Sequence, residues 1–137
     1  MRKEGRTMLL VRTYIAAGGA HGIGLYADEF IPAGTLVWQF ISGFDIKFSK
    51  WALERLHPLA QKSVMHYCYV DINDADTIVL CSNDARFMNH SQRPNTAASA
   101  HGAEDSIALR DIQAGEELTY DYLLEDGDGG RKLSMAD

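Results

Sequence analysis

Short β-prone runs separated by turn residues fill most of this sequence, and they limit the fold more than any other feature. Strand candidates occupy residues 7–15, 23–27 and 36–41. Two turns of the same form, Ile31-Pro32-Ala33-Gly34 and Ile112-Gln113-Ala114-Gly115, contain a glycine that can take the left-handed conformation. The pattern predicts one domain of 137 residues made mostly of short strands and turns.

Two hairpins are predicted in the second half of the chain. Residues 67–72 and 77–81 flank a polar turn, and residues 96–100 face residues 106–110 across another. Residues 16–19, Ala-Ala-Gly-Gly, are interpreted instead as a loop that follows the first strand.

Helical spacing of apolar residues is confined to one part of the chain. It predicts a helix over residues 48–56, limited by Pro58, and a second, short helix over residues 59–66. We expect Trp51 of the first helix to pack against a core rather than to recognise a ligand. The Gly- and Asp-rich end of the chain predicts a flexible tail over residues 126–137.

Charge and cysteine usage exclude several classes of protein. Thirteen Lys and Arg residues against nineteen Asp and Glu residues give a formal charge of -6, which is the wrong sign for a nucleic-acid partner. Cys68 and Cys81 have no C-x-x-C pairing, so a disulfide framework is not expected, although a single bridge between them stays open. No apolar run approaches the ~20 residues that span a bilayer, and Arg12 interrupts the apolar start. We therefore expect a soluble intracellular protein that does not bind membranes.

The string His21-Gly22-Ile23-Gly24-Leu25-Tyr26-Ala27 contains G-x-G-x-x-A, which in dinucleotide-binding proteins opens a helix. Here Pro32 and Gly34 follow a strand-like stretch without helical periodicity, and this context disfavours that hypothesis. The two glycines of the string let the backbone approach either a ligand or a neighbouring strand, and their spacing leaves both interpretations open.

Residues 86–95, Arg-Phe-Met-Asn-His-Ser-Gln-Arg-Pro-Asn, form the most unusual stretch, because many polar side chains lie beside two apolar ones. They indicate either a built site or a well-bonded loop. The five histidines lack metal-ligand spacing, so we expect no protein-held metal. Near the end, Tyr120 and Tyr122 are expected on one face of a strand, because side chains alternate along a strand.

Three motifs occur in a fixed order along the chain. They are Gly22-Ile23-Gly24-Leu25, then residues 86–91 with Pro94-Asn95, and then residues 117–122. Together they resemble the SET-domain protein lysine methyltransferases, in the minimal stand-alone form of bacteria and viruses. The resemblance implies a mostly β SET (β-clip) fold of small curved sheets.

The same resemblance implies how the domain is organised. In the SET fold, the second and third motifs thread together into a pseudoknot-like C-terminal site, and a short helical insert, here at about residues 42–66, shapes the substrate groove. The implied SET catalytic domain covers residues 1–125 and leaves residues 126–137 as the tail.

The resemblance implies S-adenosylmethionine as the cofactor and a protein lysine as the substrate, with a histone tail as the usual case. The implied cofactor-binding residues are His21, Gly22, Ile23, Gly24, Tyr67, Arg86, Asn89, His90 and Tyr122. The implied catalytic residues are Tyr122, Tyr67 and Tyr120, with Tyr69 as the alternative to Tyr67. No metal is required.

Two positions give finer expectations. Tyr120 stands where the family has Phe or Tyr, and the tyrosine favours mono- and dimethylation over trimethylation. Gln92 stands where many members have Cys, and no cysteine follows Tyr122, so the zinc-binding segment that closes the lysine channel in many relatives is missing. Residues 123–137, a second subunit in a homodimer, or the substrate itself would then close the channel.

Two other functions stay open beside the methyltransferase. A catalytically idle SET-like module would bind a peptide or a partner protein without transferring a methyl group. A dinucleotide-dependent oxidoreductase would be stabilised by NAD. The Tyr122, Asn89 and His90 side chains favour the active enzyme.

Overall fold

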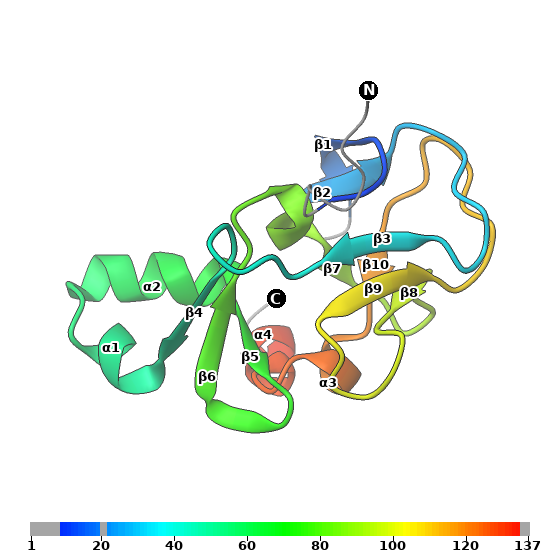
Figure 1. The fold of residues 1–137 in the computed structure, drawn as a ribbon. Coiled ribbons are helices and arrows are strands. Elements are labelled where there is room, and N and C mark those ends of the chain that lie inside the picture. Colours follow the sequence, from blue (N-terminus) through cyan, green and yellow to red (C-terminus); the bar gives the residue numbers. More distant parts are fainter. Residues whose placement is uncertain (1–8, 20–21, 135–137) are drawn as a thin grey trace.

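A computed structural model describes residues 9–19 and 22–134 of the protein. Within this part of the chain, short strands form small separate sheets, and short helices lie between and beside them (Figure 1). The predicted cofactor residue His21 and the predicted strand residues 7–8 lie outside the described residues. The predicted mostly β architecture of small sheets is confirmed.

The described strands belong to four sheets. These are β1 (Thr13–Gly19) with β2 (Gly22–Ala27); β3 (Leu36–Gln39), β9 (Asp105–Ala108) and β8 (Thr96–Ala97); β4 (Ile46–Ser49), β6 (Asp74–Leu80) and β5 (Tyr69–Asp71); and β7 (Asn89–His90) with β10 (Thr119–Tyr120). The helices are α1 (Lys50–Glu54), α2 (Pro58–Tyr67), the 3₁₀ turn η1 (Asp84–Phe87), α3 (Tyr122–Glu125) and α4 (Gly129–Ser134). Neighbouring strands are antiparallel except for β7 and β10, which run parallel.

Both predicted hairpins are present. Strands β5 and β6 pair up to Asp71 and Asp74, so their turn is shorter than the sequence suggested. Strands β8 and β9 pair through Thr96 with Ala108 and Ala97 with Ile107. Each hairpin contacts the C-terminal part of the chain. The Thr96 hydroxyl on β8 donates to the Thr119 carbonyl on β10, and the Val70 carbonyl on β5 accepts from the Gly127 amide after β10.

The prediction of a loop at residues 16–19 is wrong. Strand β1 continues to Gly19, with Ala16 opposite Gly24 and Ala17 opposite Ile23. Pairing with β2 over six residue pairs outweighs the weak strand preference of alanine and glycine, which depends strongly on context.

The first predicted helix is shorter than expected. Phe48 belongs to β4, and α1 begins after Ser49, whose hydroxyl accepts a hydrogen bond of 3.1 Å from the Ala52 amide as an N-cap. Trp51 is 65% exposed rather than packed in a core, and the Arg55 guanidinium lies 4.6 Å from its ring centroid. The expectation for Trp51 was therefore wrong, because Leu53 on the same helix supplies the buried side chain.

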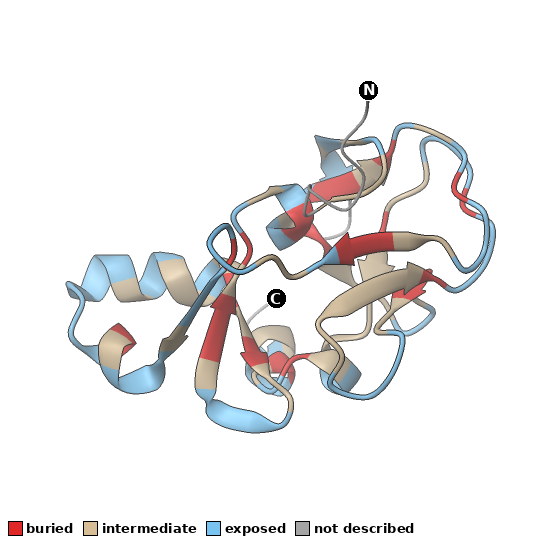
Figure 2. Cartoon of the chain, in the orientation of Figure 1, coloured by how far each residue is buried: buried red, intermediate tan, exposed pale blue. Residues whose placement is uncertain are grey.

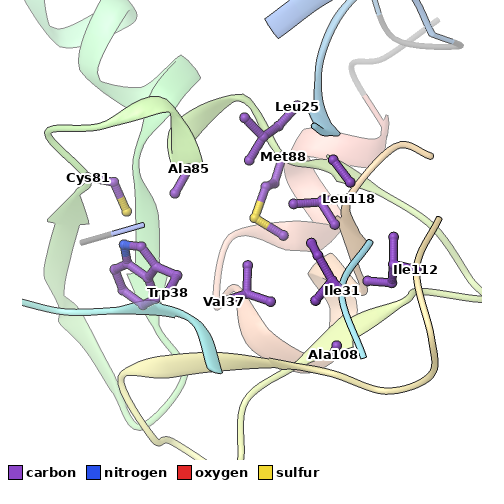
Figure 3. Close-up of a cluster of buried hydrophobic side chains, with 11 residues drawn as sticks. Leu25, Ile31, Val37, Trp38, Cys81, Ala85, Met88, Ala108, Ile112 and Leu118 are labelled. Carbon is purple, nitrogen blue, oxygen red and sulfur yellow. The ribbon is translucent and has the colours of Figure 1, made fainter. Parts of the chain in front are cut away.

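Two hydrophobic clusters hold these elements together (Figure 2). The larger one joins β2, β3, β9 and the turns around Ile31 and Ile112, and Figure 3 shows Trp38 at one end of it beside Cys81 and Ala85. The smaller one lies between α1, α2, β5 and β6 and contains Cys68. Cys68 and Cys81 are both free thiols, so the bridge left open by the sequence does not form.

Residues 126–134 differ from the flexible tail that the sequence predicted. Asp126 is 2% exposed, and its carboxylate accepts a 3.0 Å hydrogen bond from the Val70 amide on β5. The Gly127 amide donates to the Val70 carbonyl, and helix α4 follows directly (Figure 1). Contacts with β5, which is distant in sequence, order this segment despite its glycine content. Within the described residues, no helix is long and apolar enough to cross a membrane.

Candidate active site

The second and third sequence motifs meet at the parallel pair of β7 and β10. Thr119 lies opposite Asn89, and Tyr120 lies opposite His90. The Ser91 amide donates a 3.1 Å hydrogen bond to the Tyr120 carbonyl, which extends the pairing beyond the two strands. Segments about thirty residues apart in the sequence are thereby fixed side by side.

The Asn89 side chain connects this pair to the glycine motif of β2. Its amide nitrogen donates to the Ile23 carbonyl at 3.1 Å and to the Glu117 carboxylate at 2.8 Å. A Cβ atom at Gly24 would lie 2.4 Å from that carboxylate oxygen and 3.2 Å from the Asn89 amide nitrogen. Gly24 therefore makes room for the side chains of Glu117 and Asn89.

His90 orients the start of helix α3. Its Nδ1 atom accepts a hydrogen bond of 3.1 Å from the Tyr122 amide, so the proton of the neutral ring is on Nε2. The two expected tyrosines do not share a strand, because the Asp121 side chain caps α3 by accepting from the Leu123 amide and helix α3 begins at Tyr122. The rings of Tyr120 and Tyr122 still lie close, with 4.8 Å between their centroids.

Tyr122 is fixed through its hydroxyl group. The hydroxyl donates a 2.9 Å hydrogen bond to the Met88 carbonyl, immediately before β7. Burial, with smaller contributions from Asp126 and Glu117, raises the pKa of Tyr122 to about 12. Burial also raises the pKa of Tyr120 well above its usual value. Both phenols therefore keep their protons at neutral pH, so neither is a base in its ionised form.

Tyr67 and Tyr69 lie at different depths. The ring of Tyr67, at the end of α2, meets the Phe87 ring edge to face at 5.6 Å, and the Arg86 guanidinium lies 5.3 Å from the Tyr67 centroid. Tyr69, on β5, packs against Trp38 with 6.4 Å between ring centroids. Tyr67 thus belongs to the surface around η1, whereas Tyr69 belongs to the wall beside the main core.

Two cavities meet at these tyrosines. The first, which we call the tyrosine cavity, has a volume of about 100 Å³, and its walls include Trp38, Tyr67, Tyr69, Tyr120 and Tyr122. The second, which we call the basic cavity, has a volume of about 900 Å³ and is lined in part by Ile23, Phe87, Asn89 and His90. Six residues line both cavities: His66, Tyr67, Arg86, Met88, Tyr122 and Lys132. These six residues form the wall that the cavities share.

The two cavities differ in charge. Four carboxylate residues line the tyrosine cavity: Asp71, Glu104, Asp105 and Glu125. The residues described around the basic cavity include no Asp or Glu but carry the cationic side chains of Lys62, Arg86, Arg131 and Lys132. The tyrosine cavity therefore suits a cationic ligand, and the basic cavity suits one that carries a carboxylate.

Most of the side chains predicted for the cofactor gather around the basic cavity. Ile23, Tyr67, Arg86, Asn89, His90 and Tyr122 line it. Gly22 and Gly24 flank Ile23 on β2 but do not line the cavity themselves. Of the three tyrosines predicted for catalysis, Tyr67 and Tyr122 lie in the shared wall, and Tyr120 lines the tyrosine cavity alone.

The sequence did not indicate Lys132 or Trp38 as parts of the site. Lys132 and the cavity wall that it forms belong to the segment predicted as a flexible tail. Trp38 lies on a strand whose apolar residues all resemble core residues in the sequence. The one signal in the sequence for an ordered C-terminal segment is an acidic residue, Asp126, followed six residues later by the basic Lys132, with which it pairs in the structure. Such a spacing is common by chance.

The fold and the site define a class of small β protein, in which a narrow tyrosine-lined cavity is joined to a wide ligand cavity through an interlaced pair of short strands. The chain belongs to the SET domain family, whose model matches residues 22–123.

Relatives support this assignment. The chain is 32% identical over 118 residues to an Aspergillus oryzae protein named histone-lysine N-methyltransferase, H3 lysine-4 specific, and 32% identical over 110 residues to a Schizosaccharomyces pombe protein named histone-lysine N-methyltransferase, H3 lysine-36 specific. These matches cover 80% and 74% of this chain but only 9% and 13% of those proteins.

A solved structure shows the same fold. It is a humanized mutant of the Chaetomium thermophilum Polycomb Repressive Complex 2 bound to the inhibitor GSK126, and it matches with a TM-score of 0.60 at 20% identity. The match covers 88% of this chain and 16% of that chain.

Proposed function

We propose that the protein is an S-adenosylmethionine-dependent protein-lysine N-methyltransferase that acts on a histone or another basic protein. One observation carries the proposal: a narrow cavity with acidic residues and a wide cavity with basic residues meet at Tyr122. A lysine side chain entering from one side and a methyl donor bound on the other would meet at this wall. The SET-family relatives with histone-lysine methyltransferase names support the same activity.

The basic cavity fits the cofactor in size and charge. About 900 Å³ lies within the range of roughly 300–1,000 Å³ that is usual for ligand sites. Arg86 and Lys62 could hold the carboxylate of the methionine part, and Phe87 and Leu59 offer apolar surface to the adenosine part. S-adenosylmethionine supplies a methyl group on a positively charged sulfur, and the sulfur leaves as a neutral thioether when the methyl carbon bonds to nitrogen.

The tyrosines prepare the lysine for this transfer. A free lysine has a pKa of about 10.4, so deprotonating it at pH 7 costs about 4 to 5 kcal/mol. The walls formed by Trp38, Tyr69 and Tyr120 exclude water and disfavour the ammonium form. The Tyr122 hydroxyl already donates its hydrogen to Met88, so its oxygen lone pairs remain to accept weak C–H contacts from the polarised methyl group.

The finer parts of the proposal concern the number of methyl groups on the product, the oligomeric state and the residues that make up the functional unit. The Tyr120 hydroxyl takes up room in the narrow tyrosine cavity, which favours mono- and dimethyl products. We extend the functional unit past residue 125 to include α4, because α4 lines both cavities through Lys132. A homodimer and an intracellular location remain parts of the proposal, and light scattering at assay concentration tests the dimer.

Transfer of labelled methyl from S-adenosylmethionine to core histones and to a bacterial lysate tests the activity. Tyr122→Phe should abolish most of the transfer, whereas Tyr14→Phe, which removes a hydroxyl from the distant and exposed end of β1, should leave it unchanged. Mass spectrometry then identifies the lysine and the number of methyl groups. Cofactor binding without transfer to either substrate set, together with stable capture of a peptide, would favour the idle binding module instead. Stabilisation by NAD but not by S-adenosylmethionine would favour the oxidoreductase.

A further inference from the structure

Lys132 on helix α4 is a nearly buried cation beside the reacting position. Its side chain is 15% exposed, it lines both cavities, and its ammonium nitrogen lies 5.5 Å from the centroid of the Tyr122 ring. The ammonium also donates to the Cys68 carbonyl at the end of α2. Helix α4, the Tyr122 ring on α3 and the Cys68 carbonyl after α2 therefore fix the position of this charge.

The counter-charge of Lys132 lies behind it. Its ammonium pairs at 2.6 Å with Oδ2 of Asp126, whose side chain is fully buried. The other carboxylate oxygen accepts from the Val70 and Asp128 amides at 3.0 Å and 2.8 Å. Asp126 lines neither cavity, whereas Lys132 lines both. The ion pair is thus a fixed dipole with its positive end toward the shared wall.

The other groups that face Lys132 do not cancel this charge at neutral pH. Burial raises the pKa of the Cys68 thiol to about 11, so it is neutral, and Tyr122 is neutral for the same reason. Asp128 is paired with Arg131 at 2.6 Å.

Four groups complete the surroundings. Arg86 and His66 line both cavities, but both are exposed, so water screens them. Asp71 and Glu125 line only the tyrosine cavity and favour a cation there. Lys132 is therefore the cation in the described part of the shared wall that water screens least.

We propose that the Lys132 ammonium acts as a fixed positive charge that keeps the substrate lysine in its neutral amine form once it has entered the tyrosine cavity. The inference rests on the proposed function. It gives the acidic lining and the cationic wall complementary parts: the carboxylates of the tyrosine cavity attract the lysine as an ammonium, and Lys132 disfavours that charge at the shared wall. A like charge in a water-poor site disfavours a second one.

The charges and atoms of the reaction balance. The substrate ammonium first gives one proton to water. The neutral nitrogen then bonds to the methyl carbon while the carbon–sulfur bond breaks, and the product is a methylammonium that carries the positive charge lost by the sulfur. Lys132 changes neither its bonds nor its proton in this sequence.

The pH dependence of kcat on core histone H3 tests the inference, because kcat reports ionisations in the enzyme–substrate complex. The double variant Asp126→Asn with Lys132→Met removes both charges together and so leaves no unpaired buried charge. The asparagine side chain in this variant would keep an oxygen for the Val70 and Asp128 amides. The pH at which kcat reaches half of its maximum should increase by about one unit in this variant.

The single variant Asp126→Asn keeps the Lys132 cation and removes its counter-charge. The midpoint of the kcat profile should therefore move to lower pH. Arg110→Met removes an exposed cation that pairs with Glu116 away from both cavities, and it should leave the profile in place. A purely structural role of the pair would lower kcat in both Asp126 variants without moving the midpoint. A profile that does not move, or that moves the same way in both variants, overturns the inference.

A second readout does not depend on turnover. A peptide of the histone H3 tail with lysine labelled by carbon-13 at Cε, bound together with S-adenosylhomocysteine, reports the protonation of the bound lysine by NMR. Its titration midpoint should be higher in the double variant than in the natural protein, and equal midpoints would refute the role of Lys132. A peptide that binds and titrates in this way without ever being methylated would refute the proposed function alone.

Discussion

The Tyr122 hydroxyl donates a 2.9 Å hydrogen bond to the Met88 carbonyl, which joins the start of α3 to the residue before β7. This bond fixes the phenol in the wall between the two cavities, where both Tyr122 and Met88 are found. A hydroxyl used in this way has its hydrogen turned toward the protein and its oxygen turned toward the site.

Replacing Tyr122 by Phe should separate stability from activity. The variant loses one hydrogen bond, so its free energy of unfolding should fall by about 1 kcal/mol. Methyl transfer should fall far more, by about 100-fold or greater, because the oxygen that orients the methyl group is gone. Urea unfolding and initial rates measure the two effects. A loss of about 3 kcal/mol or more in urea would mean that the activity loss reflects unfolding.

Replacing Tyr120 by Phe should raise the number of methyl groups on the product. Tyr120 lines the narrow tyrosine cavity, and removing its hydroxyl makes space for a methylated amine to turn and react again. Mass spectra of the modified peptide over a time course would then show more trimethyl product than for the natural protein. Tyr26→Phe is a matched control, because Tyr26 stacks on Tyr14 in the β1–β2 hairpin. A natural protein that already makes mainly trimethyl product would contradict the reasoning.

The sequence allowed several local elements to be predicted, whereas the roles proposed for the site residues come from the resemblance to the SET family. The hairpins and the second helix follow from alternation, turns and the position of Pro58. Asn89 and His90 stand in a stretch whose polar density is visible without a structure. The hairpins and the helix depend on neighbours in the sequence, so sequence patterns report them, whereas Asn89 and His90 bond to Ile23 and Tyr122, which lie far away in the sequence.

The parts that could not be predicted depend on distant partners. Residues 16–19 become a strand only because β2 lies opposite them. Asp126 and Lys132 form an ordered wall because Val70 and Cys68, more than fifty residues earlier, supply the backbone groups that bind them. A segment rich in Gly and Asp has weak local preferences, so such contacts decide its structure.

The buried thiols should make the protein lose stability in alkali. Burial, with Asp45 as the next cause, raises the pKa of Cys81 from its usual 9.0 to about 12, and burial raises that of Cys68 to about 11. The unfolded chain therefore releases each proton first, so the stability is complete below pH 9 and is lost as pH rises toward 11 or 12. Each thiol contributes a slope of about 1.4 kcal/mol per pH unit in that window.

Urea unfolding between pH 8 and about pH 10.5, with a reductant present, measures this slope. Cys81→Ala should be less stable than the natural protein at pH 8 because it leaves a small cavity, but its stability should fall less steeply above pH 9. Ser82→Ala, at the exposed neighbouring position, should keep the full slope. Parallel curves for the natural protein and Cys81→Ala would show that the thiol keeps an ordinary pKa.

Asn95 should be among the positions most sensitive to substitution outside the hydrophobic clusters. It is 3% exposed, its amide nitrogen donates to the Glu117 carbonyl at 2.7 Å, and its amide oxygen accepts from the Thr119 amide at 2.9 Å. Asn95→Ala leaves both backbone groups buried without a partner, at about 1 to 3 kcal/mol each, so we expect a loss of about 3 kcal/mol in the free energy of unfolding.

Gln92→Ala is the matched control for Asn95→Ala, because Gln92 is exposed in the same loop and its truncation should change stability by no more than about 0.5 kcal/mol. The Asn95 bonds also hold Thr119 of β10 in register with Asn89 of β7, so the damage should extend to the site. Binding of S-adenosylmethionine to Asn95→Ala should weaken at temperatures where the variant is still folded. Equal stability of the two variants would mean that the backbone pairing of β7 with β10, and not the Asn95 side chain, stabilises this pair of strands.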